Sequence, residues 1–384
     1  MGKYAHYDLP KQIVLLSTAD WDAPLWTNKQ QIAVRLAEDF EVVYVEPVAV
    51  FLNPKRGLQK RVWTDPSGVT VYRPSGALPF GNKLWPVNEV NCARVAADLT
   101  GLLRDKDFAQ PLVWCYPPTG QPLLKHLPHE LSCYDCVDEY SAFPGAWITA
   151  VNNMERRLMH AVDAVFTTAK SLYEAKRKYN PNTFFVPNVA DFEHFHQAAE
   201  ATPSLLLREM KRPVIGFVGA LNYKLDADLL RAVCAMRPHW SFVFVGPQRE
   251  FNAQQFIGCA NAHFLGRKDI AELPAIMAGF DFCMIPYKVD RYTHGVLPLK
   301  FFEYLATGKP VVTTPLPELE TFQHLVDVVT SAESFVEAVE RRLDDDPHVE
   351  QRVALAAQNS WEHRINSMLT HLETIRRRKA RERR

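Results

Sequence analysis

Short runs of β-branched and aromatic residues alternate with amphipathic stretches along most of the chain. This alternation predicts parallel sheets covered by helices. In the first half, helices are expected at Lys29–Ala37, Val90–Leu103 and Asn153–Ala161. The strands expected there are Ile13–Ser17, Val42–Val45, Val69–Tyr72, Pro111–Tyr116, Leu131–Tyr134, Ala164–Thr167 and Thr183–Val186. Together these elements predict one doubly wound, Rossmann-like domain over residues 1–190.

A second pattern of the same kind follows a polar stretch, residues 191–212, which we interpret as a linker. It opens with "RPVIGFVGAL" (212–221), a strand and a glycine turn, and continues with a helix at Asp226–Cys234. Further strands are expected at 240–246, 262–266, 280–286 and 310–314, and helices at Glu333–Leu343 and Val349–Arg378. The predicted class is therefore α/β, with a second Rossmann-like domain over residues 213–355, a C-terminal helix over 356–374 and a tail over 375–384.

Length and composition agree with two soluble cores. A chain of 384 residues with 47% hydrophobic residues is long enough for two domains of ordinary size. No apolar run approaches the roughly 20 residues of a membrane-spanning helix. The N-terminus, "MGKYAHYDLPKQ", lacks the apolar region of a signal peptide, and the seven cysteines are an odd number that suits a reducing compartment. We expect a cytoplasmic protein.

Charge is distributed unevenly although the formal net charge is zero. The last ten residues, "IRRRKARERR", carry seven basic groups and one acidic group. Such a tail binds acidic phospholipid or nucleic acid, or is a solvated, disordered end.

The glycine turn "GFVGAL" (216–221) is a candidate phosphate-binding element, because glycine lets backbone N–H groups approach a phosphate. A dinucleotide-binding turn would read G-x-G-x-x-G, whereas this turn has only Gly216 and Gly219. Lys224 follows close to the next helix. It either meets a diphosphate or is a surface lysine beside Asp226, the expected N-cap.

Three groups of residues resemble metal-binding motifs, but we favour structural roles for all of them. The string "DAD" (226–228) begins a helix, and Asp344–Asp346 ends one. His126, His129, Cys133 and Cys136 have ligand-like spacing, but the strand at 131–134 would bury Cys133 as a small apolar residue. No metal site is expected.

Carboxylates follow two strands of the first domain. "YDCVDEYSAF" (134–143) places Asp138 after a strand, where it acts either as general base on a substrate hydroxyl or as a helix cap. A structural role is favoured for the neighbouring Asp135. "STADWDAPLW" (17–26) brings Asp20, Trp21 and Asp22 to the same edge, as an acceptor-binding shelf or as packing of the loop.

The stretch "LPLKFFEYLATGKPVV" (297–312) places two charges at the start of an apolar helix. Pro298 suits a first helical turn. Lys300 adds a cation to the helix N-terminus, a combination that binds anions such as a diphosphate. Glu303 has the lone pairs to accept both hydroxyls of a ribose. The alternative is a simple ion pair between Lys300 and Glu303.

"PLKFFEYLATGKPVVTTPLPEL" (298–319) strongly resembles the nucleotide-sugar-binding segment of GT-B glycosyltransferases in the family 1/family 4-like group. "GFVGAL", "SFVFVGP" (241–247), "FLGRKDIAELPAIMAGFDFCMIPY" (264–287) and "FVPNVADFEHF" (185–195) support the resemblance. "DWDAPLWTNKQQIAVRLAE" (20–38) and "YDCVDEYSAF" are similar to bacterial polysaccharide-assembly members.

The resemblance implies two facing Rossmann-like domains, the second binding a UDP- or GDP-sugar, and a C-terminal helix that packs back toward the first. It further implies donor-binding roles for a set of residues in the second domain. In that set Glu303 would bind the ribose, and Arg267 would border the base. Lys300 and the backbone from Gly295 to Leu299, with His294 beside it, would hold the diphosphate. Gly219 would let the phosphates approach. No metal cofactor is implied, since helix dipole and cations replace it.

One position departs from the family pattern. Many retaining members carry E-x7-E, whose second glutamate would be Glu303, and the first would then fall on Gly295. The donor sugar thus loses one carboxylate contact that retaining members have, which leaves both a retaining reaction and an inverting one with Asp138 as base open.

The predicted function is transfer of a sugar from a nucleotide-sugar to a lipid-linked saccharide at the inner face of the cell membrane. The basic tail would meet the anionic membrane, and no nucleic-acid partner is expected. The alternatives are a GT-B-fold nucleotide-sugar epimerase and a catalytically silent nucleotide-sugar-binding subunit.

Overall fold

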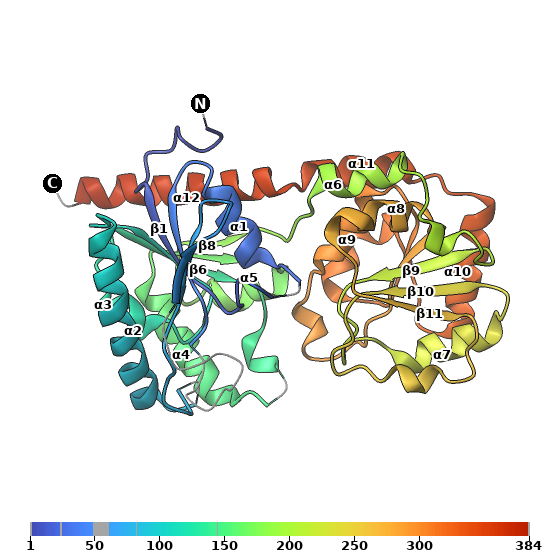
Figure 1. Cartoon of the computed structure of the whole chain (residues 1–384), viewed down its shortest axis with the longest axis horizontal. Coiled ribbons are helices and arrows are strands. Elements are labelled where there is room, and N and C mark those ends of the chain that lie inside the picture. Colours follow the sequence, from blue (N-terminus) through green and yellow to red (C-terminus); the bar gives the residue numbers. More distant parts are fainter. Residues whose placement is uncertain (1, 24, 49–60, 82, 144, 383–384) are drawn as a thin grey trace. The chain divides into compact units, whose positions relative to one another are not determined.

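A computed structural model describes residues 2–23, 25–48, 61–81, 83–143 and 145–382. The chain forms two compact units (Figure 1). The first comprises Met1–Pro187 and Ile365–Arg384, and the second comprises Asn188–Arg364. Each unit is a sheet of mainly parallel strands with helices on its faces, which is the predicted α/β class.

The described residues of the first unit contain an eight-stranded sheet in which only the β3–β4 pair is antiparallel. Across the sheet the strands are β3 (Arg61–Thr64), β4 (Thr70–Arg73), β2 (Glu41–Val45), β1 (Gln12–Leu16), β5 (Leu112–Cys115), β6 (Leu131–Cys136), β7 (Ala164–Thr167) and β8 (Thr183–Phe185). Its helices are α1 (Asn28–Leu36), α2 (Trp85–Asp105), α3 (Gln121–His126), α4 (Ile148–Ala161) and α5 (Lys170–Lys176), with a 3-10 turn, η1, at Tyr140–Ala142.

The second unit has a six-stranded parallel sheet in its described residues. The strands, in order across the sheet, are β11 (Ala262–Gly266), β10 (Ser241–Val245), β9 (Val214–Val218), β12 (Phe282–Ile285), β13 (Val311–Thr313) and β14 (Asp327–Val328). Its helices are α6 (Phe192–His196), α7 (Ala227–Met236), α8 (Leu273–Ala278), α9 (Leu299–Ala306), α10 (Ala332–Asp344) and α11 (Val349–Gln358). Short 3-10 turns are η2 (Gln197–Ala199), η3 (Leu205–Leu207), η4 (Ala253–Phe256), η5 (Ile270–Glu272), η6 (Thr293–Gly295) and η7 (Pro317–Leu325).

The core of each unit forms where parallel strands are apolar on both faces. All five residues of β9 and all five of β10 are buried, since helices cover both faces of the sheet. The stretch 191–212, expected to be a linker, forms α6, η2 and η3 and contributes Phe195, Ala198 and Leu207 to the core of the second unit. The second unit therefore begins before residue 213.

The C-terminal helix α12 (Trp361–Glu382) packs on the first unit, as predicted. Ile365, Met368, Leu369, Leu372 and Ile375 are buried, and their spacing is that of one helix face. The helical stretch predicted to be continuous over 349–378 is broken between α11 and α12, where Asn359 ends the first helix.

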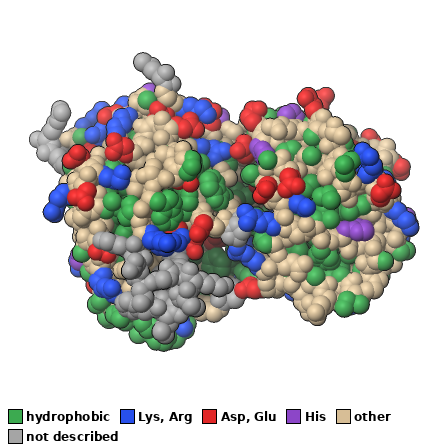
Figure 2. Space-filling view, viewed as in Figure 1, with side chains coloured by type: hydrophobic (Ala, Val, Ile, Leu, Met, Phe, Trp, Pro, Cys, Tyr) green, Lys and Arg blue, Asp and Glu red, His purple; other side chains and the backbone are tan. Residues whose placement is uncertain are grey.

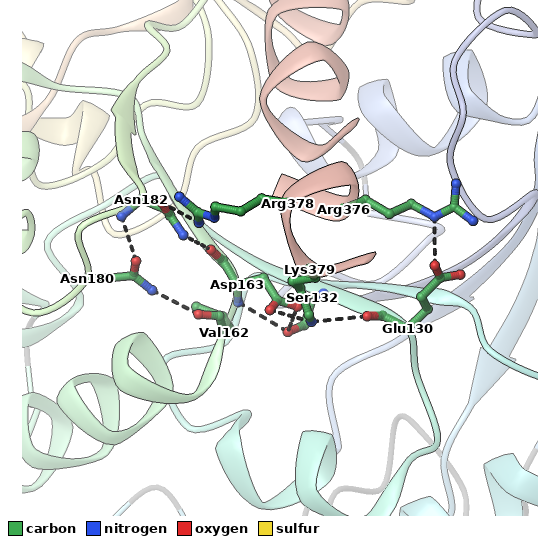
Figure 3. Close-up of polar contacts among 9 residues, drawn as sticks. All are labelled: Glu130, Ser132, Val162, Asp163, Asn180, Asn182, Arg376, Arg378 and Lys379. Carbon is green, nitrogen blue, oxygen red and sulfur yellow. Dashed lines mark hydrogen bonds and ion pairs between the residues drawn. The ribbon is translucent and has the colours of Figure 1, made fainter. Parts of the chain in front are cut away.

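The basic tail, as far as it is described, is the last part of α12 and is tied to the first unit (Figure 3). Arg376 Nε lies 2.7 Å from Glu130 Oε1, and Lys379 Nζ lies 2.6 Å from Asp163 Oδ1. Arg378 donates to Asn182 Oδ1 at 3.1 Å. The alternative of a solvated, disordered end is therefore wrong for residues 375–382. Residues 383–384 lie outside the described residues.

Candidate active site

The strand order of the second unit reverses direction between β9 and β12. Open α/β sheets bind ligands at such a switch point, outside the carboxyl ends of the two strands. Here β9 leads into Gly219, and β12 leads into Tyr287, so these two residues border the expected crevice. Helix α9 begins beside them with Lys300 in its first turn.

Lys300 is fixed at this point by aromatic side chains from both strands. Its Nζ donates to the Tyr287 hydroxyl at 2.7 Å and lies 4.4 Å from the ring centroid of Phe217. In the described part of the chain no ion pair within 4.0 Å joins Lys300 to Glu303, so the simple helix ion pair is not formed, although Lys300 lowers the pKa of Glu303 through space. The ammonium group is thus held at the carboxyl ends of β9 and β12, where the sequence predicts an anion-binding site.

Gly219 lies directly below this ammonium group. Its φ is +144°, and a Cβ added to it would lie 2.7 Å from Lys300 Nζ. Its N–H donates to Val245 O at 2.8 Å, which fixes the turn to β10. Only glycine both adopts this conformation easily and leaves the space that an approaching phosphate needs.

Glu303 is half-buried one turn further along α9 and has no hydrogen-bonding partner among the described residues. Burial raises its pKa to about 7; Lys300 opposes this shift and Asp191 adds to it. A buried carboxylate without a partner lowers the stability of the unliganded protein. It gains two hydrogen bonds when it accepts from both hydroxyls of a diol. Glu303 therefore has free acceptor capacity of the kind that its predicted ribose-binding role needs.

The loop from residue 288 to residue 298 is organised by Asp290. Its Oδ1 accepts from the N–H groups of Tyr292 and Thr293 at 2.8 and 2.9 Å. The N–H groups of His294, Gly295 and Val296 donate to acceptors within the loop. Fewer backbone N–H groups between Gly295 and Leu299 are therefore available to an anion than the sequence predicts. Within the described residues, the N–H groups of Leu299 and Lys300 have no acceptor. His294 is exposed.

Two further predicted donor residues lie at the same edge of the sheet. Lys224 Nζ lies 4.6 Å from the ring centroid of Tyr292, and Lys224 O accepts from Lys288 N at 2.7 Å, which joins it to the loop of Asp290. Arg267 is exposed and directly follows β11, two strands away from β9. Two strand spacings, about 10 Å in a sheet, separate β11 from β9. Asp226 caps α7 by accepting from Leu229 N at 3.0 Å, as predicted.

Three residues of this site were not predicted. Tyr287 holds Lys300, Asp191 lies close enough to Glu303 to raise its pKa, and Asn188 donates to Leu297 O at 2.6 Å just before α9. Asn188 and Asp191 belong to the quoted segment "FVPNVADFEHF", whose polar residues in an apolar context were the available signal.

In the first unit, Asp138 follows β6 and is half-buried. The capping role that was its structural alternative belongs to Glu139, whose Oε1 accepts from Ser141 N at 3.2 Å and Ser141 Oγ at 2.6 Å. Burial works in the opposite direction, but Lys176 and the Ser141 hydrogen bonds hold the pKa of Glu139 below its ordinary value. Asp138 is thus the carboxylate of this pair that does not cap η1.

A buried charge network anchors the loop that carries Asp138. Lys176 Nζ lies 2.6 Å from Glu155 Oε2 and 3.3 Å from Glu139 Oε2. The Tyr134 hydroxyl donates to Glu155 Oε1 at 2.8 Å. Strand β6, η1, α4 and α5 are therefore tied together behind Asp138, and Asp135 is fully buried in β6, in keeping with its structural interpretation.

The three residues of the predicted acceptor-binding shelf, Asp20, Trp21 and Asp22, all form contacts within the first unit. Trp21 is only 5% exposed; its backbone N–H donates to Glu46 Oε1 at 2.7 Å and its indole N–H to Asp65 Oδ2 at 2.9 Å. Asp22 forms a 3.3 Å ion pair with Arg73. Asp20 O accepts from the Gln30 side chain at 2.8 Å. The packing alternative therefore fits Trp21.

A cavity of about 590 Å³ lies instead at the switch point of the first sheet, between β1 and β5. Its wall includes Ser17 after β1, Pro117 after β5 and Tyr140 two residues after Asp138. Most of the remaining lining is apolar. The described residues thus place an apolar cavity next to the loop of the candidate base.

Cys133 and Cys136 are buried in β6. Over the described residues, no group of three or more His, Cys, Asp or Glu side chains is arranged to hold a metal ion.

Comparison with known proteins identifies the class. The family model for Glycosyl transferases group 1 matches residues 212–345, which is most of the second unit. TuaH of Bacillus subtilis (strain 168), provisionally named a teichuronic acid biosynthesis glycosyltransferase, is 28% identical over 269 residues, covering 64% of this chain and 68% of TuaH.

Solved structures match the chain along nearly its whole length. The UDP-forming α,α-trehalose-phosphate synthase of Burkholderia vietnamiensis superposes with a TM-score of 0.70 at 14% identity, covering 97% of this chain and 98% of the synthase. Anabaena HepE, solved in complex with UDP and glucose, has a TM-score of 0.57 at 15% identity, covering 96% and 98%. At these identities the structures show the GT-B fold.

The chain has the GT-B fold, and its residues 212–345 match the group 1 glycosyltransferases. No helix in the part of the chain that the structure describes combines the length and apolar character needed to cross a membrane.

Proposed function

We propose that this glycosyltransferase moves a sugar from a UDP- or GDP-sugar to a hydroxyl of a lipid-linked saccharide, in the assembly of a surface polysaccharide. The observation that carries the proposal is the position of Lys300 Nζ over Gly219, at the switch point of the second sheet and at the start of α9. A fixed cation, a helix N-terminus and a glycine turn together form a diphosphate site.

The comparisons support the two ends of the reaction. HepE was solved with UDP and with glucose, which supports a nucleotide-sugar donor. TuaH is named for teichuronic acid biosynthesis, which supports a polysaccharide product. The apolar cavity beside the Asp138 loop supports a lipid-linked rather than a small polar acceptor.

In this proposal each donor residue binds one part of the nucleotide-sugar. Glu303 accepts the two ribose hydroxyls, and Lys300 with the first N–H groups of α9 holds the diphosphate. These groups balance the charge of the diphosphate without a metal cofactor, because a helix terminus and a fixed ammonium are already oriented toward it. Arg267 borders the base, and Lys224 with His294 lies at the edge of the loop.

The reaction we propose is an inverting displacement. Asp138 takes the proton of the acceptor hydroxyl while the hydroxyl oxygen attacks the anomeric carbon. The bond from the anomeric carbon to the diphosphate oxygen breaks, and its electron pair leaves with the nucleoside diphosphate, whose charge Lys300 stabilises. Gly295, at the position of a carboxylate in E-x7-E members, favours this mechanism over a retaining one.

A screen of UDP- and GDP-sugars by thermal shift tests the donor assignment, because a ligand that binds only the native state raises its melting temperature. The true donor should stabilise the wild type, and calorimetry should show at least tenfold weaker binding to Glu303→Ala. Equal binding to the wild type and Glu303→Ala would contradict the donor site. Incubation with donor alone separates transfer from epimerisation, since an epimerase forms product without acceptor.

A further inference from the structure

An exposed patch of apolar and cationic side chains lies on the first unit, at the rim of the apolar cavity described above. It consists of Phe80, Lys83, Leu84, Trp147, Ile148 and Arg157, and we call it the aromatic patch. Phe80 is 56% exposed, Trp147 53%, Leu84 46% and Ile148 43%. Figure 2 shows apolar side chains gathered at the lower end of the first unit, near the start of α2. Single exposed apolar residues are ordinary, but a contiguous group of this kind marks an interaction surface.

The backbone holds Phe80 outward against its own preference. Its φ is +68°, in the left-handed region that bulky residues rarely adopt. The N–H groups of Lys83 and Leu84 both donate to Phe80 O, at 2.9 and 2.8 Å, and fix the turn. The strained turn therefore displays an aromatic ring to solvent beside the first turn of α2.

The cations of the patch lie over aromatic rings of the patch and of the neighbouring Trp85. Lys83 Nζ is 4.7 Å from the ring centroid of Trp147 and 5.8 Å from that of Phe80, and Arg157 is 4.3 Å from the ring of Trp85. No carboxylate in the described residues pairs with Lys83 or Arg157, and the depression that both line contains no acidic side chain. The patch thus fits a partner that presents apolar groups and negative charges side by side.

The boundary of an anionic phospholipid bilayer has this chemistry, because tryptophan and phenylalanine enter the headgroup region while lysine and arginine meet phosphate. We infer that the aromatic patch docks the protein on an anionic membrane. The C-terminal helix, whose Arg376 and Lys379 are paired with Glu130 and Asp163, is not the main contact.

The patch is continuous with the cavity beside Asp138. Phe80, Ala146 and Trp147 line the cavity, and Ala146 and Trp147 also line the depression over the patch. A lipid chain leaving the bilayer would therefore enter an apolar cavity whose wall includes Tyr140. In this respect the inference rests on the proposed function, in which the cavity takes the lipid-linked acceptor.

Sedimentation of the full chain with vesicles of phosphatidylcholine, with and without phosphatidylglycerol, tests the inference. The wild type should bind the anionic vesicles in a salt-sensitive manner. Trp147→Ser combined with Ile148→Ser should weaken binding at least fivefold. Lys83→Gln combined with Arg157→Gln should remove the preference for phosphatidylglycerol.

Two matched controls separate the patch from other surfaces. Ile257→Ser removes an apolar side chain that is 82% exposed on the second unit, and Arg381→Gln removes an exposed cation of the tail. Both should bind vesicles as the wild type does. Unchanged binding by the patch variants, or loss of binding by Arg381→Gln alone, would overturn the inference. So would a wild-type dimer that the patch variants convert to monomer, which would make a second copy the occupant.

Binding of UDP-sugar to each variant provides an independent readout, because the donor site lies in the second unit. Folded patch variants should retain donor affinity and the unfolding temperature of the wild type. A wild type that binds vesicles but no nucleotide-sugar would remove the proposed function and leave the docking surface intact.

Discussion

Lys300 lies so close over Gly219 that a Cβ on this glycine would be 2.7 Å from the lysine Nζ. The turn after β9 is therefore in close contact with the first turn of α9, and a side chain at position 219 would collide with Lys300. The Tyr287 hydroxyl accepts from Lys300 Nζ at 2.7 Å and keeps the ammonium group at this turn, so an incoming anion meets a cation that is already in place.

Gly219→Ala should weaken donor binding at least tenfold, because the methyl group displaces Lys300 Nζ from the crevice. Gly258→Ala is the matched control, since Gly258 also has a positive φ, +97°, but open space around its Cβ position. Both variants should lose roughly 1–3 kcal/mol of stability from backbone strain. Calorimetry should show a donor defect only in Gly219→Ala, and equal defects would contradict the contact argument.

Glu303→Gln should stabilise the unliganded protein above neutral pH. The folded-state pKa of about 7 lies above the ordinary 4.5, so the folded state binds more protons than the unfolded state between these values. The stability contributed by this group therefore falls as pH rises through that window, by on the order of 1–3 kcal/mol. Denaturant unfolding of both proteins at pH 5 and pH 8 measures the difference.

At pH 8 the variant should be the more stable protein, and at pH 5 the two should be similar. Glu303→Gln should also bind the nucleotide-sugar more weakly, because the amide donates where the carboxylate accepts. A variant that is less stable at pH 8 would show that Glu303 has a favourable partner in the folded protein.

Asp138→Asn should lower transfer by roughly 10²-fold or more, the usual cost of removing a general base. Donor affinity should stay at the wild-type value, since Asp138 lies in the first unit. Transfer is measured with donor and a lipid-linked acceptor, and donor affinity by calorimetry. Wild-type transfer rates in this variant would remove Asp138 from the mechanism, and an inactive wild type would support the silent-subunit alternative.

Arg376→Gln combined with Lys379→Gln should lower the free energy of unfolding of the first unit by about 1–3 kcal/mol, because both side chains make charged hydrogen bonds to it. Arg381→Gln, an exposed residue on the same helix, should change it by less than about 0.5 kcal/mol. Equal effects of the two sets would show that the tail acts through its overall charge.

The sequence predicts the central strands well, because a buried parallel strand is a short apolar run with turn residues at both ends. Ala164–Thr167 is predicted with the same bounds that β7 has. The edge strand β3 was not predicted, since three of its four residues are exposed and lack the apolar pattern. The two-residue strand β14 is too short to give any pattern.

The candidate site divides in a similar way. Lys300, Glu303 and Gly219 stand in local patterns that carry their own chemistry. The structure brings Lys300 Nζ next to Gly219, with Glu303 further along the same helix. Tyr287 could not be predicted, because its role depends on a hydrogen bond to a residue 13 positions away. For Trp21 the local pattern predicts an exposed acceptor-binding role, but the side chain is buried. Its hydrogen bonds to Glu46 and Asp65, residues distant in the sequence, could not be predicted from that pattern.

The central claim is that Lys300 binds the diphosphate of a nucleotide-sugar and Glu303 its ribose. Calorimetric titration of the wild type, Lys300→Met and Glu303→Ala with a nucleoside diphosphate and with its parent nucleoside tests both roles at once. Lys300→Met should weaken the diphosphate at least tenfold and leave the nucleoside unchanged, whereas Glu303→Ala should weaken both. Equal binding of the diphosphate by the wild type and Lys300→Met would contradict the account.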